Sequence, residues 1–189
     1  HQKMTDVTLT SEQEAIVDRL LEFAADTTAG TKFLTLIGPA GSGKTTTVGT
    51  AIDRMIAVKQ TLSVLLPEEE KQKNAVISNR LILAATTNKA ATELTNKCSI
   101  TASTIHSVLG LVLKPNYQTG IDYLVDVKKN TVYNSTIFID EVSMLDDGIK
   151  AFIDKKCIDC RIIFIGDDKQ LKPVNKKDMP GFHSEEVLN

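Results

Sequence analysis

Short apolar runs alternate with amphipathic stretches along most of the chain. Two stretches, residues 10–25 and the one that starts near residue 44, carry apolar side chains three or four positions apart, which predicts helices. A third helix is predicted from Asn88. Buried strands are predicted at 33–38, 80–86, 136–141 and 161–167. This alternation predicts an α/β fold, in which helices cover both faces of a parallel sheet.

One segment interrupts the alternation. Residues 111–135 contain Pro115, Gly120 and alternating apolar positions, which predicts a small β-hairpin insertion. The segment after residue 174 shows no clear element.

Length and charge limit the possible architectures. A chain of 189 residues can form one α/β domain with a core but not two. We expect this domain at 9–175, after a disordered N-terminus or tag remnant at 1–8 and before a linker at 176–189. No apolar run is long enough to cross a membrane. The net charge of −2 argues against a generally basic surface, so a nucleic acid would be held in a local groove.

The cysteines raise the question of a metal or redox site. Cys157 and Cys160 form a C-x-x-C pair, and Cys98 stands apart. Zinc would need two more ligands at suitable spacing, and the three histidines are scattered. We expect no zinc, and reduced thiols in a cytosolic protein.

The turn after the first predicted strand carries the strongest chemical signal. The stretch "GPAGSGKT" fits G-x-x-x-x-G-K-[ST] and lies between a predicted strand and a predicted helix, as a phosphate-binding loop must. The helix N-terminus and the loop amides favour an anion, Lys44 can reach the β and γ phosphates, and the Thr45 hydroxyl can ligate Mg²⁺. Nucleotide contacts are predicted for Gly38, Pro39, Ala40, Gly41, Ser42, Gly43, Lys44, Thr45 and Thr46.

A pair of acidic residues ends the third predicted strand. Asp140 follows the apolar residues of "IFIDE" and is the predicted partner of Thr45 in holding Mg²⁺. Glu141 beside it could orient and polarise the attacking water. These residues predict a nucleoside triphosphatase but do not say what hydrolysis drives.

Five motifs in order resemble the N-terminal RecA-like motor domain of superfamily 1 DNA helicases of the RecD/Dda type. They are "GPAGSGKT", "AATTNKAATEL", "STIHSVL", "IFIDEVSML" and "FIGDDKQLKPV". The resemblance implies an enzyme that uses ATP and Mg²⁺ to move along single-stranded DNA, 5′ to 3′, in the cytoplasm of a bacterial cell or phage-infected host. A different P-loop ATPase switch and a non-catalytic nucleotide- or DNA-binding module remain as alternatives.

The same resemblance assigns further residues. Gly166, Asp167 and Gln170 match the family motif that faces the nucleotide. The resemblance implies that the Gln170 amide senses the γ-phosphate. Thr87 and Lys89 match one DNA-contacting motif, in which Thr86 stands where the family usually has proline, so we expect a less rigid loop.

A second DNA-contacting motif is matched by Thr104 and His106. For Thr87 a helix N-cap is the competing role, and for His106 a place in the core.

Two assignments stay open between alternatives. Gln13 matches the adenine-reading glutamine of the family, but it could instead form a capping box with Thr10. Ser11 with Glu14 could do the capping and leave Gln13 free. The hairpin lies where this helicase type places a duplex-splitting pin, and an ordinary surface hairpin fits the residues equally well.

The chain departs from the family in its arginines. Its four arginines are Arg19, Arg54, Arg80 and Arg161, and none stands in a motif that reaches the γ-phosphate. The family's second motor domain supplies such arginines. We therefore expect a second RecA-like domain as the partner of this one, and expect this chain alone to be nearly inactive.

Overall fold

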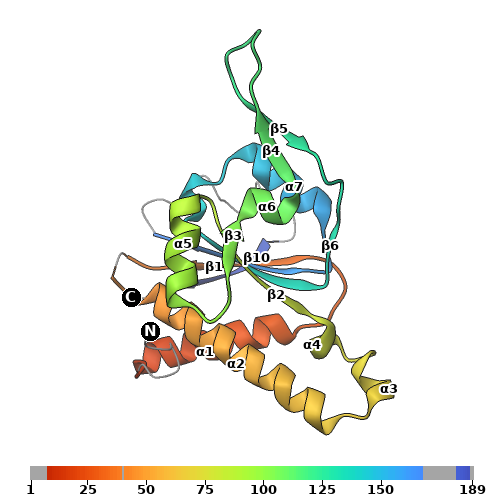
Figure 1. Cartoon of the computed structure of the whole chain (residues 1–189). Helices are drawn as coiled ribbons and strands as arrows, with labels where there is room; N and C mark the ends of the chain where they lie inside the picture. The colour runs from red at the N-terminus through yellow and green to blue at the C-terminus, as the bar shows by residue number, and fades with distance from the viewer. Residues whose placement is uncertain (1–7, 40, 168–181, 188–189) are drawn as a thin grey trace.

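A six-stranded parallel sheet forms the centre of the molecule (Figure 1). The computed structural model describes residues 8–39, 41–167 and 182–187, in the last range for the backbone only. The strand order is β10-β1-β9-β7-β2-β3, and every neighbouring pair is parallel. The strands are β1 (Lys32–Ile37), β2 (Arg80–Ala85), β3 (Ala102–Thr104), β7 (Ser135–Asp140), β9 (Arg161–Gly166) and β10 (Phe182–Val187).

Helices cover both faces of this sheet. Three helices, α1 (Ser11–Ala25), α2 (Lys44–Leu65) and α5 (Asn88–Lys97), pack on one face, where Leu34 and Ile163 point. On the other face, Phe33 and Phe164 stack with ring centroids 5.8 Å apart. That face is covered by α6 (Ile105–Leu109) and α7 (Asp147–Lys156). In the described ranges, no helix has the length and apolar character needed to span a bilayer.

The predicted α/β sheet is confirmed, and its edges add what the sequence missed. The four predicted strands form the contiguous centre of the sheet, as β1, β9, β7 and β2. The tail was expected to hold no element and to belong to a linker. Instead, residues Phe182–Val187 pair with β1 as an edge strand, so this part of the tail belongs to the sheet. The short strand β3 forms the other edge.

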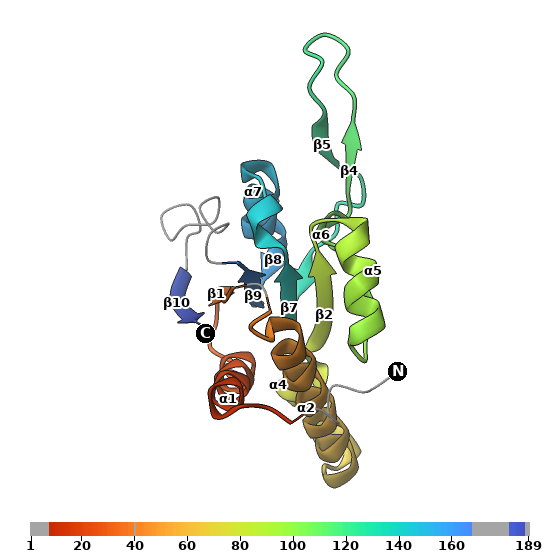
Figure 2. The same ribbon diagram turned by 90° about the vertical axis from the view of Figure 1, so that its left-hand side faces the viewer.

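The predicted hairpin insertion projects from the body of the domain (Figures 1 and 2). Strands β4 (Leu111–Lys114) and β5 (Tyr123–Asp126) pair antiparallel, and their connecting turn exposes 92% of Tyr117. The predicted insertion also holds β6 (Val132–Tyr133), which pairs with β8 (Cys157–Ile158) and rejoins the main body.

A buried lysine fixes the base of the hairpin. The Lys156 ammonium, at the end of α7, donates to Asp126 Oδ1 at 2.6 Å, to Asn130 Oδ1 at 2.8 Å and to the Leu109 carbonyl. The hydrogen bond from Lys156 is the main reason why the pKa of Asp126 is lowered. One side chain thus holds together α6, α7 and the segment that follows β5.

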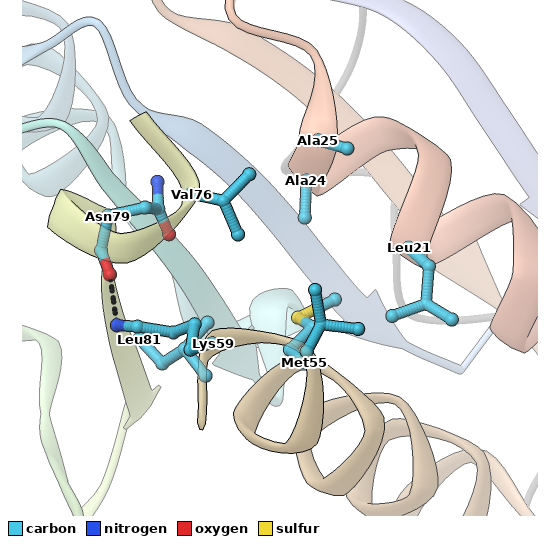
Figure 3. A pocket seen from close by; sticks show the side chains of 9 residues that line it. Leu21, Ala24, Ala25, Met55, Lys59, Val76, Asn79 and Leu81 are labelled. Carbon is cyan, nitrogen blue, oxygen red and sulfur yellow. Dashed lines mark hydrogen bonds between the residues drawn. The ribbon is translucent and has the colours of Figure 1, made fainter. Parts of the chain in front are cut away.

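An apolar pocket lies away from the predicted phosphate loop, near the amino ends of the strands (Figure 3). It is lined by α1, α2, the start of β2 and the short helix α4 (Ala75–Ser78), which follows α3 (Glu68–Lys71). Figure 3 shows the Lys59 ammonium bonded to the Asn79 carbonyl at its rim. Burial lowers the pKa of Lys59. This pocket is therefore separate from the residues predicted to bind nucleotide.

Lys156→Met should lower the melting temperature by several degrees, because it keeps the apolar stem but leaves Asp126 and Asn130 without their donor. Lys155→Met is the matched control, since Lys155 is exposed on the same turn of α7. Thermal unfolding followed by circular dichroism compares the two. Equal melting temperatures would show that the Lys156 contacts do not contribute to stability.

Candidate active site

The predicted site residues meet at the edge formed by the carboxyl ends of the strands. Parallel pairing places Ile37 beside Gly166 and Ala85 beside Asp140. The segments that leave these four strand ends carry the phosphate loop, the acidic pair and the first DNA-contacting motif. This is the edge at which open α/β sheets bind their ligands.

The phosphate loop takes the backbone conformation that its glycines permit. Gly41 and Gly43 have φ of 81° and 85°, in the left-handed region where a side chain is strained. Gly43 is also the N-cap of α2, so the turn delivers the chain directly into the helix. The Gly38 amide donates to the Gly166 carbonyl at 3.2 Å, which fixes the start of the loop to the end of β9.

Lys44 closes over this loop from the first turn of α2. Its ammonium donates to the Pro39 carbonyl at 2.9 Å and to the Gly38 carbonyl. The half-buried Thr45 and Thr46 follow it on the helix. Ammonium, hydroxyl groups and a helix N-terminus together form the donor set that a phosphate group requires. The residues present therefore fit a nucleotide phosphate.

Asp140 and Glu141 bring two carboxylates of like charge to the same end of the strands. The Asp140 carboxylate accepts a hydrogen bond from the Glu141 amide at 2.9 Å. Burial raises the pKa of Asp140, against the lowering effect of this bond and of the Lys44 and Lys97 charges. Burial also raises the pKa of Glu141, followed by repulsion from Asp140 and Glu93. Crowded carboxylates that resist ionisation fit a site for a divalent cation.

Glu141 has an unusual backbone. Its φ of 57° and ψ of 46° lie in the left-handed region, which costs a residue with a side chain on the order of 1 kcal/mol or more. Its carbonyl accepts hydrogen bonds from the Met144 amide and the Thr86 hydroxyl, both at 3.0 Å. These contacts hold Glu141 at the turn between β7 and the short helix η2 (Val142–Met144).

Gln13 performs the capping role and also touches the phosphate loop. Its amide oxygen accepts from the Thr10 amide at 3.0 Å, and its Nε2 donates to the Ser42 carbonyl at 3.3 Å. The alternative of capping by Ser11 and Glu14 was wrong, because Thr10 is the N-cap and Glu14 pairs with Arg54 through both oxygens. Both ends of the Gln13 amide are thus occupied, and reading adenine would require them to exchange partners.

The predicted DNA-contacting residues lie in two helix starts. Thr87 caps α5, accepting from the Ala90 amide at 3.1 Å, and Thr104 caps α6, accepting from the Ser107 amide at 3.2 Å. Lys89 is exposed in the first turn of α5, and His106 is half-buried in α6. Because a capping hydroxyl accepts with its oxygen, each threonine keeps its proton available for another acceptor.

Two predicted residues, Ala40 and Gln170, lie outside the described residues. Asp167, at the exit of β9, is half-buried at the same edge. The loop at Thr86 makes a contact that was not predicted. The Thr86 hydroxyl ties it to the Glu141 carbonyl, a contact that proline could not make, and its lower rigidity stays a prediction. The sequence pattern contains no signal for this contact, since it joins residues far apart in the chain.

The arginines lie away from the phosphate loop. Arg80 and Arg161 are the first residues of β2 and β9, so they lie at the amino ends of the strands, opposite the phosphate loop. The Arg161 guanidinium is buried and donates to backbone carbonyls there. Arg54 is bound by Glu14, about 15 Å along α2 from Lys44. Arg19 lies over the Phe23 ring, 6.0 Å from its centroid.

Comparison with known families identifies this arrangement. A family model described as an AAA domain matches residues 22–176. The chain belongs to this family. The AAA domain is 31% identical over 142 residues to the ATP-dependent DNA helicase dda of Enterobacteria phage T4. That match covers 75% of this chain but only 28% of the helicase.

Solved structures agree on the fold of the AAA domain. The Pif1 helicase from Candida albicans matches with a TM-score of 0.53 at 18% identity, over 96% of this chain and 40% of that one. The Aeropyrum pernix ORC1 protein, solved in complex with DNA, matches with a TM-score of 0.55 at 15% identity, over 97% and 46%. The resemblance to a superfamily 1 motor domain is confirmed. The chain spans less than half the length of each of these relatives.

Asp140→Asn should raise the melting temperature of the nucleotide-free AAA domain at pH 7. The folded chain holds the Asp140 proton more tightly than the unfolded chain does, so the ionised carboxylate lowers stability above its folded pKa. The gain should shrink as the pH falls toward the ordinary value of 3.8. Melting curves from pH 4 to pH 8 test this, with Asp122→Asn on the exposed hairpin as control. A lower melting temperature at pH 7 would contradict it.

Proposed function

We propose that this AAA domain binds and hydrolyses ATP with Mg²⁺ as one half of a DNA helicase motor. The observation that carries the proposal is the meeting of Lys44 with the Asp140–Glu141 pair at one sheet edge, where the Lys44 charge acts on the Asp140 carboxylate. A lysine for phosphate and two carboxylates for cation and water are the parts that phosphoryl transfer to water requires.

Each residue has a defined part in this proposal. Lys44 and the loop amides hold the β and γ phosphates, and Thr45 and Asp140 would hold Mg²⁺, which supplies charge neutralisation when bound. Glu141 orients the attacking water and accepts its proton. Its raised pKa suits this, because a carboxylate that binds a proton more readily is a better base. Gln13, which contacts the phosphate loop through the Ser42 carbonyl, would read adenine after exchanging its hydrogen-bond partners, and Gln170 senses the γ-phosphate.

Single-stranded DNA is the proposed track. Thr87, Lys89, Thr104 and His106 provide hydroxyl groups, an ammonium and an imidazole for backbone and base contacts. Lys89 stands in the first helical turn of α5, where the helix dipole disfavours a cation and a bound phosphate would compensate. The printed name of the dda relative, a DNA helicase, supports this track. Tyr117 on the projecting hairpin could stack on a base at a duplex fork.

Lys44→Ala should weaken ATP binding at least about tenfold, since a phosphate contact of roughly 1.4 kcal/mol or more is lost. Folding should survive, because within the described residues the Lys44 ammonium bonds only to two loop carbonyls. Titration with a fluorescent ATP analogue measures this, with Lys73→Ala in an exposed loop as control.

Glu141→Gln should bind the analogue like the parent and lose turnover, which separates binding from catalysis. Equal affinity in Lys44→Ala and the parent would refute the phosphate-loop assignment.

The 189-residue chain should hydrolyse ATP very slowly even with saturating single-stranded DNA. None of its arginines is placed to neutralise charge on the γ-phosphate, and a supplied arginine contributes roughly 10³ to 10⁵ in rate in related sites. That factor corresponds to about 4 to 7 kcal/mol of barrier. Steady-state phosphate release from this chain and from a protein extended by a second motor domain tests the difference. Turnover at tens per second from the short chain would contradict the half-motor proposal.

A further inference from the structure

Thr86 connects the DNA-contacting segment to the acidic pair. It directly follows β2, whose last residue, Ala85, pairs with Asp140 at the end of β7. Thr86 is 9% exposed, and its hydroxyl donates to the Glu141 carbonyl at 3.0 Å. The two neighbouring strands therefore remain joined for one residue beyond their ladder, through a side chain instead of a backbone amide.

The bond acts on a residue with an unfavourable backbone conformation. Glu141 is one of four residues other than glycine with positive φ in the described ranges. A backbone in that region persists only where its surroundings hold it. The Glu141 carbonyl has two donors, and the Met144 amide comes from the turn that Glu141 itself begins. Thr86 is thus the donor that fixes this carbonyl relative to the rest of the sheet.

Proline at this position could not make the contact, because it has neither a hydroxyl nor an amide proton. Threonine lacks the fixed φ angle of proline, but its hydroxyl forms a hydrogen bond to the end of the neighbouring strand. The next residue, Thr87, caps α5 with its own hydroxyl, so the chain on the far side of Thr86 is fixed as well.

We propose that Thr86 is a positioning residue for the hydrolytic step, holding Glu141 in the backbone conformation from which its carboxylate orients the attacking water. The inference rests on the proposed function of Glu141. Loss of the hydroxyl leaves the Glu141 carbonyl with the Met144 amide alone, and the backbone can then relax out of the left-handed region. The carboxylate then leaves its position, while the phosphate loop, which Thr86 does not touch, keeps its structure.

The test compares Thr86→Val with Thr86→Ser in the 189-residue chain. Valine keeps the shape and removes the hydroxyl, whereas serine keeps the hydroxyl and removes a methyl group. Single-turnover hydrolysis of radiolabelled ATP, with the protein in excess, measures the slow rate over hours. A fluorescent ATP analogue measures affinity.

Thr86→Val should slow hydrolysis about 10- to 100-fold, the effect expected of a misplaced catalytic group. Its affinity should stay within about twofold, because ground-state binding is untouched. Thr86→Ser should restore most of the rate. Thr92→Val is the matched control, since the Thr92 hydroxyl donates to the Asn88 carbonyl of its own helix, away from the acidic pair.

Two results would overturn the inference: a parental rate in Thr86→Val, or an equal loss in Thr86→Ser. Hydrogen exchange of the amides in η2 gives an answer independent of rate. It should accelerate in Thr86→Val and not in Thr86→Ser, and unchanged exchange in Thr86→Val would also overturn the inference. The proposed function fails separately, if Glu141→Gln hydrolyses ATP like the parent or Lys44→Ala binds the analogue like the parent.

Discussion

Parallel strand pairing is the constraint on which the whole site depends. Because each strand of this sheet runs in the same direction, the connection between two strands must carry the chain back, and every strand ends on the same side of the sheet. The phosphate loop, the acidic pair and the DNA-contacting turn come from separate parts of the sequence. They meet because β7 and β2 are neighbours in the sheet, and only β9 lies between β7 and β1. The strand order thus determines which segments of the chain meet at the site.

The unfavourable energies of this arrangement are backbone strain and repulsion between carboxylates, and both lie where the strands end. Glu141 has a left-handed backbone there, and its exposed carboxylate is repelled by that of the half-buried Asp140. A bound phosphate would give the Lys44 ammonium a partner better than backbone carbonyls, and a cation would relieve the carboxylates. The proposed nucleotide and cation would therefore relieve the repulsion between the two carboxylates, which favours coupling between ligand binding and the local conformation.

The centre of the fold could be predicted from the sequence, and its periphery could not. The four central strands are buried on both faces, so they read as continuous apolar runs such as "RIIFIG". Strand β3 has only three residues, and β10 contains two glutamates, so neither gives that signal. The phosphate loop and the acidic pair were predictable because local spacing defines them. The bond from Thr86 to Glu141 was not, because it depends on strand order, and the capping roles of Gln13 and Thr87 could be foreseen only as alternatives.

The same topology links the hydrolytic edge to the hairpin. From Glu141 the chain passes through η2 into α7, a helix of ten residues and therefore about 15 Å long. Its last residue, Lys156, holds Asp126 and Asn130 at the base of the hairpin and the end of α6, whose N-cap is Thr104. One continuous stretch of chain and the hydrogen bonds of Lys156 thus connect Glu141 to the base of the projecting hairpin and to α6, the helix that Thr104 caps.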